Sequence, residues 1–127
     1  MKALDRIFGG LLNLGACGHT LGTVRWLPFM SGIFIWSLGS SLAAALLGVL
    51  NLVRAGRPDD KTLAVLSATG CACWALLAFA FGRSIGNTFD PRAMSHLIVS
   101  LVLAGFSVRT LTGVERSEPV AAALSRG

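Results

Sequence analysis

Residues 28–53 read PFMSGIFIWSLGSSLAAALLGVLNLV, a stretch without a charged side chain. A helix needs about 20 apolar residues to cross a hydrocarbon core of about 30 Å. Backbone amide and carbonyl groups cannot stay unpaired in lipid, so a stretch of this kind crosses as a helix. The segment therefore predicts a membrane protein and guides the interpretation of the rest of the chain.

Three further apolar stretches are long enough to cross a bilayer, which gives four expected spans in all. They lie at about residues 4–24, 28–53, 62–82 and 92–111. Of the 127 residues, 54% are hydrophobic and 13% charged, whereas soluble domains carry about 25% charged residues. The predicted fold is all-α, an integral membrane four-helix bundle in up-down-up-down order, formed by residues 1–112.

Turn-forming and capping residues separate the expected spans. Pro28 is predicted to begin the second helix, and Pro91 to occupy the first position of the fourth with Asp90 as its N-cap. Asp59 and Asp60 are expected to cap the third helix. The loops are short, so neighbouring helices should pack antiparallel.

Basic residues are distributed unevenly over the two sides of the predicted bundle. One side carries Lys2, Arg6, Arg54, Arg57, Lys61, Arg109, Arg116 and Arg126, and the other carries Arg25, Arg83 and Arg92. Cytoplasmic loops hold the excess of Lys and Arg, so we expect both termini in the cytoplasm and a multi-pass protein of the cell membrane. Residues 113–127 are expected to form an exposed tail. The charges stand singly at span ends, which argues against nucleic acid as a partner.

Residues 14–17 read LGAC, which resembles the cleavage motif before a lipidated cysteine. The apolar run continues past Cys17 to Val24, however, and Asp5 lies in the region that a signal peptide keeps positive. We therefore interpret this segment as a retained spanning helix.

Small and polar residues recur at helical spacing in every expected span. They are Gly15, Gly18 and Gly22 in the first, Ser37, Ser41, Ala44, Gly48 and Asn51 in the second, Ser67, Gly70, Trp74, Ala78 and Phe81 in the third, and Arg92, His96, Ser100 and Ser107 in the fourth. Residues three or four apart share one face of a helix, and small residues let helices approach closely in lipid. We expect these faces to form the helix-packing seams of a bundle with a polar interior.

The two histidines of the chain both fall on or beside these faces. At 1.5 Å per residue, His19 lies about 22 Å above the cytoplasmic start of its span, and His96 about 6 Å below the outer start of its own. In a core of about 30 Å, both imidazoles therefore lie at one depth, in the outer half. Ionisable residues within spans are candidates for function. We predict a ligand-binding site formed by His19, His96, Arg92 and Asn87.

Several roles are open for this site. It is an outward-facing polar pocket that binds or passes a small molecule or relays protons, since histidine titrates near neutral pH. Alternatively, His19 and His96 are the axial ligands of a b-type haem in an electron-transfer or membrane-anchor subunit. A third function is that of an accessory subunit, which packs through Gly18 and Gly22 on a larger membrane complex or a second copy. The structural alternative is a polar cluster that only closes the end of the bundle.

The sequence lacks motifs for enzyme chemistry. Cys71 and Cys73 form CxC rather than CxxC, and on a helix their side chains point about 200° apart, which argues against a thiol oxidoreductase. Cys17 projects about 160° away from His19, so the two cannot chelate a metal. All 6 carboxylates are expected near helix ends or outside the spans. We expect a non-enzymatic protein that has no cofactor or metal apart from the haem alternative.

Overall fold

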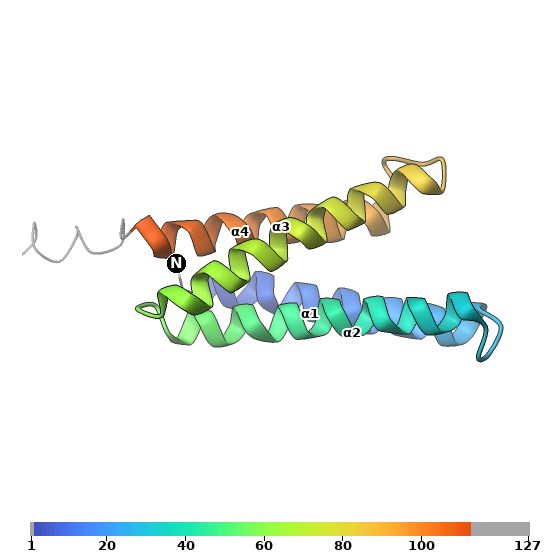
Figure 1. Ribbon diagram of the computed structural model, residues 1–127, viewed down its shortest axis with the longest axis horizontal. Coiled ribbons are helices and arrows are strands. Elements are labelled where there is room, and N and C mark those ends of the chain that lie inside the picture. The colour runs from blue at the N-terminus through green and yellow to red at the C-terminus, as the bar shows by residue number, and fades with distance from the viewer. Residues whose placement is uncertain (1, 113–127) are drawn as a thin grey trace, which may run out of the picture.

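The computed structural model describes residues 2–112, and these form helices and no strand. The helices are α1 (Lys2–Trp26), α2 (Gly32–Gly56), α3 (Lys61–Ser84) and α4 (Pro91–Thr112). Short turns join consecutive helices at alternate ends of the molecule (Figure 1). The predicted all-helical fold of four helices is confirmed for this part of the chain. The expected tail, residues 113–127, lies outside it.

Three of the helices, α2, α3 and α4, are long and apolar enough to span a membrane. α1 is as long as α2 but opens with Lys2, Asp5 and Arg6, so a span at residues 4–24 stays a prediction. Large apolar side chains cover the outside of the molecule, and Trp36, for example, is 80% exposed. An outside of this kind suits contact with acyl chains.

The helices pair into two helical hairpins, α1–α2 and α3–α4, each closely packed internally. The hairpins meet at the end where Lys2, Gly56 and Lys61 lie and diverge toward the end where α1 leads into α2 (Figure 1). We call these the closed end and the open end. Between the hairpins lies an apolar core with one fully or nearly buried residue from each helix: Leu12, Leu47, Cys71 and Leu103.

Small and polar residues form the contact between α1 and α2. A Cβ at Gly48 would lie 3.2 Å from the backbone nitrogen of Asn13, so only glycine lets the two helices come this close. Toward the open end, the hydroxyl oxygens of Thr23 and Ser37 are 2.6 Å apart. The buried residues of α1 are Asp5, Gly9, Leu12, Ala16 and Thr23. Their spacing places them on one face of the helix.

The second helix begins later than predicted, at Gly32 instead of Pro28. The Ser31 hydroxyl accepts a hydrogen bond from the amide of Phe34 at 3.2 Å, and Met30 just before it adopts a left-handed φ of 59°. The serine sets the helix start because its side chain satisfies an amide that has no partner within the helix.

The predicted caps of α3 and α4 are confirmed. Of the two aspartates before α3, Asp60 is the cap, and its carboxylate accepts a hydrogen bond from the amide of Leu63 at 2.9 Å. Asp90 accepts one from the amide of Arg92 at 2.9 Å. Pro91, between Asp90 and Arg92, is the first residue of α4. An amide at this position has no partner within the helix, so proline, which lacks the amide hydrogen, loses no hydrogen bond here.

The close contact at Gly48 can be tested with a matched pair of variants. We expect Gly48→Leu to destabilise the protein by about 1–3 kcal/mol, the usual cost of forcing atoms into a packed contact. Gly39→Leu on the same helix should change stability little, because nothing lies within 4 Å of a Cβ there. Chemical denaturation of the purified protein in detergent measures both. Equal losses in the two variants would contradict the close approach of α1 and α2.

Candidate functional site

The two histidines lie between the apolar core and the open end, among side chains from all four helices. Nε2 of His19 is 3.1 Å from the hydroxyl oxygen of Ser37, which also contacts Thr23. On the other hairpin, the Trp74 indole donates a hydrogen bond to Nδ1 of His96 at 3.3 Å. We call these five residues the histidine site.

The imidazole of His96 packs directly on α1. A Cβ at Gly15 would lie 3.0 Å from both Cε1 and Nε2 of this ring, so glycine is needed for the contact. Gly15 precedes His19 by one helical turn, and the two histidines are close enough to interact electrostatically. The structure thus brings both imidazoles to neighbouring levels, as the spacing along the chain predicts.

The other two predicted site residues lie at the rim of the open end. The exposed Arg92 guanidinium donates hydrogen bonds to both carboxylate oxygens of Asp90, at 3.1 and 3.0 Å. It remains near enough to interact electrostatically with His19. Asn87 is exposed in the turn before α4. The four predicted residues therefore do not form one buried pocket: His96 is half-buried and His19 exposed, while Arg92, paired with Asp90, and Asn87 are exposed at the open end.

A small cavity lies beside His96. It has a volume of ≈ 30 Å³ and is lined by Leu11, Leu12, Gly15, Ser95, His96 and Val99. Sites for small organic molecules measure about 300–1,000 Å³, whereas this volume suits about one or two water molecules. The histidine site as it stands fits water or a proton better than a metabolite.

The Nε2 atoms of the two histidines face different groups. Nε2 of His19 contacts Ser37, and Nε2 of His96 faces the backbone of Gly15. Bis-histidine ligation needs one nitrogen from each ring to point at a single iron. Elsewhere in residues 2–112, no group of three or more His, Cys, Asp or Glu side chains is placed to hold a metal ion.

Of the three glycines expected on the packing face of α1, Gly15 contacts another helix. No atom lies within 4 Å of a Cβ at Gly18, and at Gly22 only the ring of Trp26 on the same helix comes near, at 3.9 Å. Contacts of Gly18 and Gly22 with a second molecule stay a prediction. Ser41 and Gly48, in contrast, are buried on the face of α2 that meets α1.

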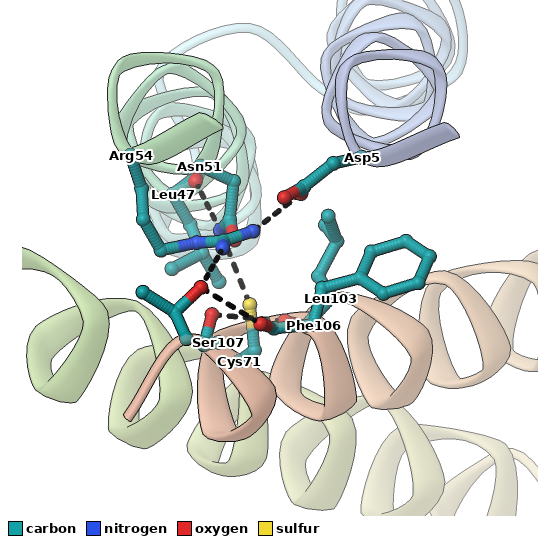
Figure 2. Close-up of polar contacts among 9 residues, drawn as sticks. Asp5, Leu47, Asn51, Arg54, Cys71, Leu103, Phe106 and Ser107 are labelled. Atoms are coloured by element: carbon teal, nitrogen blue, oxygen red, sulfur yellow. Dashed lines mark hydrogen bonds and ion pairs between the residues drawn. The ribbon is translucent and has the colours of Figure 1, made fainter. Parts of the chain in front are cut away.

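A second polar cluster lies at the closed end, around a buried ion pair (Figure 2). The Arg54 guanidinium of α2 contacts the Asp5 carboxylate of α1, and the two side chains are 1% and 9% exposed. Arg54 also donates hydrogen bonds to the side-chain oxygens of Asn51 at 3.4 Å and Thr110 at 3.3 Å. The guanidinium therefore joins α1, α2 and α4.

Asn51 extends this cluster to the remaining helix. Its amide group donates a hydrogen bond to the backbone carbonyl of Leu47 at 2.9 Å and lies 3.2 Å from the sulfur of Cys71 in α3. The thiol is fully buried, so the contact gives the amide a second partner inside the apolar core. Figure 2 shows these groups gathered between the hairpins.

The burial of this pair differs from what the sequence predicts. The prediction that the second helix ends near residue 53 leaves Arg54 among the cytoplasmic charges, but α2 continues to Gly56 and buries it. Asp5 does lie near the start of a helix, as expected, but on its buried face. The spacing along the chain indicates this burial. Asp5 stands four residues before Gly9, and Arg54 stands three residues after Asn51, so each charged residue shares a face of its helix with a buried residue.

Comparison with models of known protein families, with curated proteins and with solved structures finds no match to this chain. Function therefore has to be inferred from the two polar clusters, namely the histidine site toward the open end and the Asp5–Arg54 pair at the closed end.

Removing one member of the buried pair should be far more costly than removing both. We expect Asp5→Asn to destabilise the protein by about 3–5 kcal/mol, because the guanidinium then stays buried without its counter-charge. The double variant Asp5→Leu with Arg54→Met should recover most of this loss, since no buried charge remains. Denaturation in detergent measures both, and an Asp5→Asn protein as stable as the unsubstituted one would contradict the buried pair.

The rim ion pair predicts a pH dependence. Side-chain hydrogen bonds from Arg92 lower the pKa of Asp90 from 3.8 to about 2. Because this pKa is lower in the folded protein than in the unfolded chain, the ion pair stabilises the fold fully above pH 3.8. This stabilisation is lost as the pH falls through about 2. Carbon NMR of the carboxyl group should show this titration, and Arg92→Gln should move it upward. Arg25→Gln is the control, and a shift of the same size there would contradict the specific contact.

Proposed function

We propose that the protein is a multi-pass membrane protein that takes up and passes protons, with their accompanying water, at the histidine site. The observation that supports this most is the convergence of polar side chains from all four helices on two imidazoles. Polar and ionisable groups among apolar spans are costly and are usually retained for a function. Histidine is the side chain that exchanges protons most readily in the physiological pH range.

The size of the neighbouring cavity narrows the choice of ligand. A volume of ≈ 30 Å³ beside His96 suits water better than a metabolite. Water next to an imidazole can deliver or remove its proton without a large movement of the protein. This favours proton uptake over the binding of an organic molecule.

Polar groups connect the histidine pair with the open end. Thr23, Ser37 and His19 form a row of hydrogen-bonding side chains, in which the Thr23 hydroxyl also donates to the backbone oxygen of His19 at 2.9 Å. In the other direction the apolar core separates the site from the closed end. The site is thus accessible from one side, and complete passage requires the hairpins to move apart at the core.

The distribution of basic residues suggests which side this is. With both termini in the cytoplasm, as the positive-inside rule predicts, the open end faces outward. The proposed protein of the cell membrane then takes up protons from the outside. α1 crosses the bilayer in this arrangement along with α2, α3 and α4.

Proton flux into vesicles tests the proposal. The purified protein is reconstituted into lipid vesicles that contain a pH-sensitive dye, and an inward proton gradient is applied. We expect faster acidification than in protein-free vesicles, and a return to the protein-free rate in His19→Gln and His96→Gln. Ser37→Ala should slow the flux, because Ser37 contacts His19.

Ser40→Ala is the matched control for Ser37→Ala. The hydroxyl of Ser40 is exposed and bonds only the backbone oxygen of Trp36 at 3.0 Å on the same helix, so its removal should leave the flux unchanged. Wild-type flux at the protein-free rate, or histidine variants as fast as the wild type, would contradict the proposal. A visible spectrum of the same sample tests the haem alternative. A Soret band that is lost in His96→Gln would support electron transfer by a bound haem instead of proton uptake.

A further inference from the structure

The two turns at the open end expose large apolar side chains. Trp26, the last residue of α1, is 77% exposed, and Phe29 in the following turn is 81% exposed. Met30 beside it is exposed as well. In the turn between α3 and α4, Phe89 is 78% exposed. We call these four residues the tip residues.

Contacts within the protein hold two of these rings in place. Phe29 packs edge to face on the buried Phe34 of α2, with the ring centroids 5.4 Å apart. The guanidinium carbon of Arg25 lies 5.4 Å from the ring centroid of Trp26, a cation–π contact. Most of each ring stays exposed despite these contacts, so the apolar surface of this turn is a fixed feature of the fold.

The turn that carries Phe89 is packed on the end of α3. The amide of Asn87 donates a hydrogen bond to the carbonyl oxygen of Gly82 at 3.0 Å. A Cβ at Gly82 would lie 3.2 Å from the backbone oxygens of both Asn87 and Thr88, so glycine lets the turn approach this closely. The exposed ring of Phe89 is therefore presented by a well-packed turn.

The turn at the closed end has the opposite character. Residues 57–61 read RPDDK, which includes four charged residues and no aromatic one. Residues 27–31 read LPFMS without a charge, and residues 85–90 read IGNTFD with Asp90 as their one charged residue. The closed-end turn suits water, whereas the open-end turns suit surroundings that are partly apolar.

We propose that both open-end turns insert into the boundary between lipid headgroups and acyl chains through the tip residues. These turns adjoin α2, α3 and α4, the helices long and apolar enough to span, so they lie where the helices leave the hydrocarbon core. Aromatic rings, tryptophan above all, are enriched at this level of the bilayer. Arg25 beside Trp26 supplies a cation of the kind that anchors helix ends there.

The positions of the two turns favour lipid over a protein partner. The hairpins diverge toward the open end, so the turns form two separate tips of the molecule (Figure 1). A protein partner usually covers one continuous patch with a well-packed centre, whereas a bilayer surface meets both tips at once. This inference rests on the membrane location in the proposed function, but not on proton uptake at the histidine site.

Fluorescence quenching by brominated lipids tests the depth of the tips. Trp36→Phe with Trp74→Phe leaves Trp26 as the one tryptophan of the chain. This variant is reconstituted into phosphatidylcholine vesicles whose acyl chains carry bromine either near the headgroup or near the chain end. We expect emission blue-shifted from that of tryptophan in water, and stronger quenching by bromine near the headgroup.

A second variant examines the other tip. Phe89→Trp, in a chain whose three natural tryptophans are replaced by phenylalanine, should give the same shift and the same preference for shallow bromine. If Trp74→Phe prevents folding, the difference between the unsubstituted protein and Trp26→Phe isolates the emission of Trp26.

Trp36 is the matched control for Trp26, since it is 80% exposed but lies within α2. It is four residues after Gly32 and therefore about 6 Å deeper, so a variant with Trp36 alone should be quenched more by deep bromine than Trp26 is. Quenching of Trp36 with water-like, unquenched Trp26 would overturn the inference and leave the membrane location intact. Absence of quenching in both would overturn the two together.

Two further outcomes would also overturn the inference. Strongest quenching of Trp26 by bromine at the chain end would place the turn within the hydrocarbon core. Blue-shifted but unquenched emission would assign the tips to contacts between copies of this chain. Loss of proton flux with the expected depth of Trp26 would affect proton uptake alone.

Discussion

A polar group surrounded by hydrocarbon must find its partner within the protein, because no water is available to satisfy it. This constraint explains many side-chain hydrogen bonds of the described residues. Hydroxyl and amide groups bond the backbone carbonyl one turn earlier on their own helix, as Ser107 does to Leu103 and Asn51 to Leu47. A charged group that cannot be satisfied in this way needs a counter-charge, and Arg54 of α2 finds it in Asp5 of α1.

The two polar clusters divide the molecule into a closed and an open end. At the closed end a guanidinium joins three helices, and breaking its pairing would leave a buried charge. Toward the open end, small residues such as Ser37 and Gly15 line the contacts, and the hairpins diverge (Figure 1). A bundle fixed at one end in this way is expected to change shape at the other, where the histidine site lies.

The proposed function uses the chemistry of the histidine site toward the open end. A histidine pair beside a water-sized cavity suits the transfer of protons, because neutral imidazole and water can exchange a proton without importing a large group.

The sequence by itself determined the helices, the caps at Asp60 and Asp90 and the small, polar face of each helix, because these depend on neighbours within one or two turns. It also placed His19 and His96 at similar levels, since helical rise converts residue number into height. Only the tertiary structure decided the partners. Asp5 and Arg54 are 49 residues apart, and nothing in the local sequence of either indicates the other. Arg92 pairs with Asp90 instead of a histidine. The physical reason is that periodicity gives the face of the helix on which a residue lies, but not which residue it contacts.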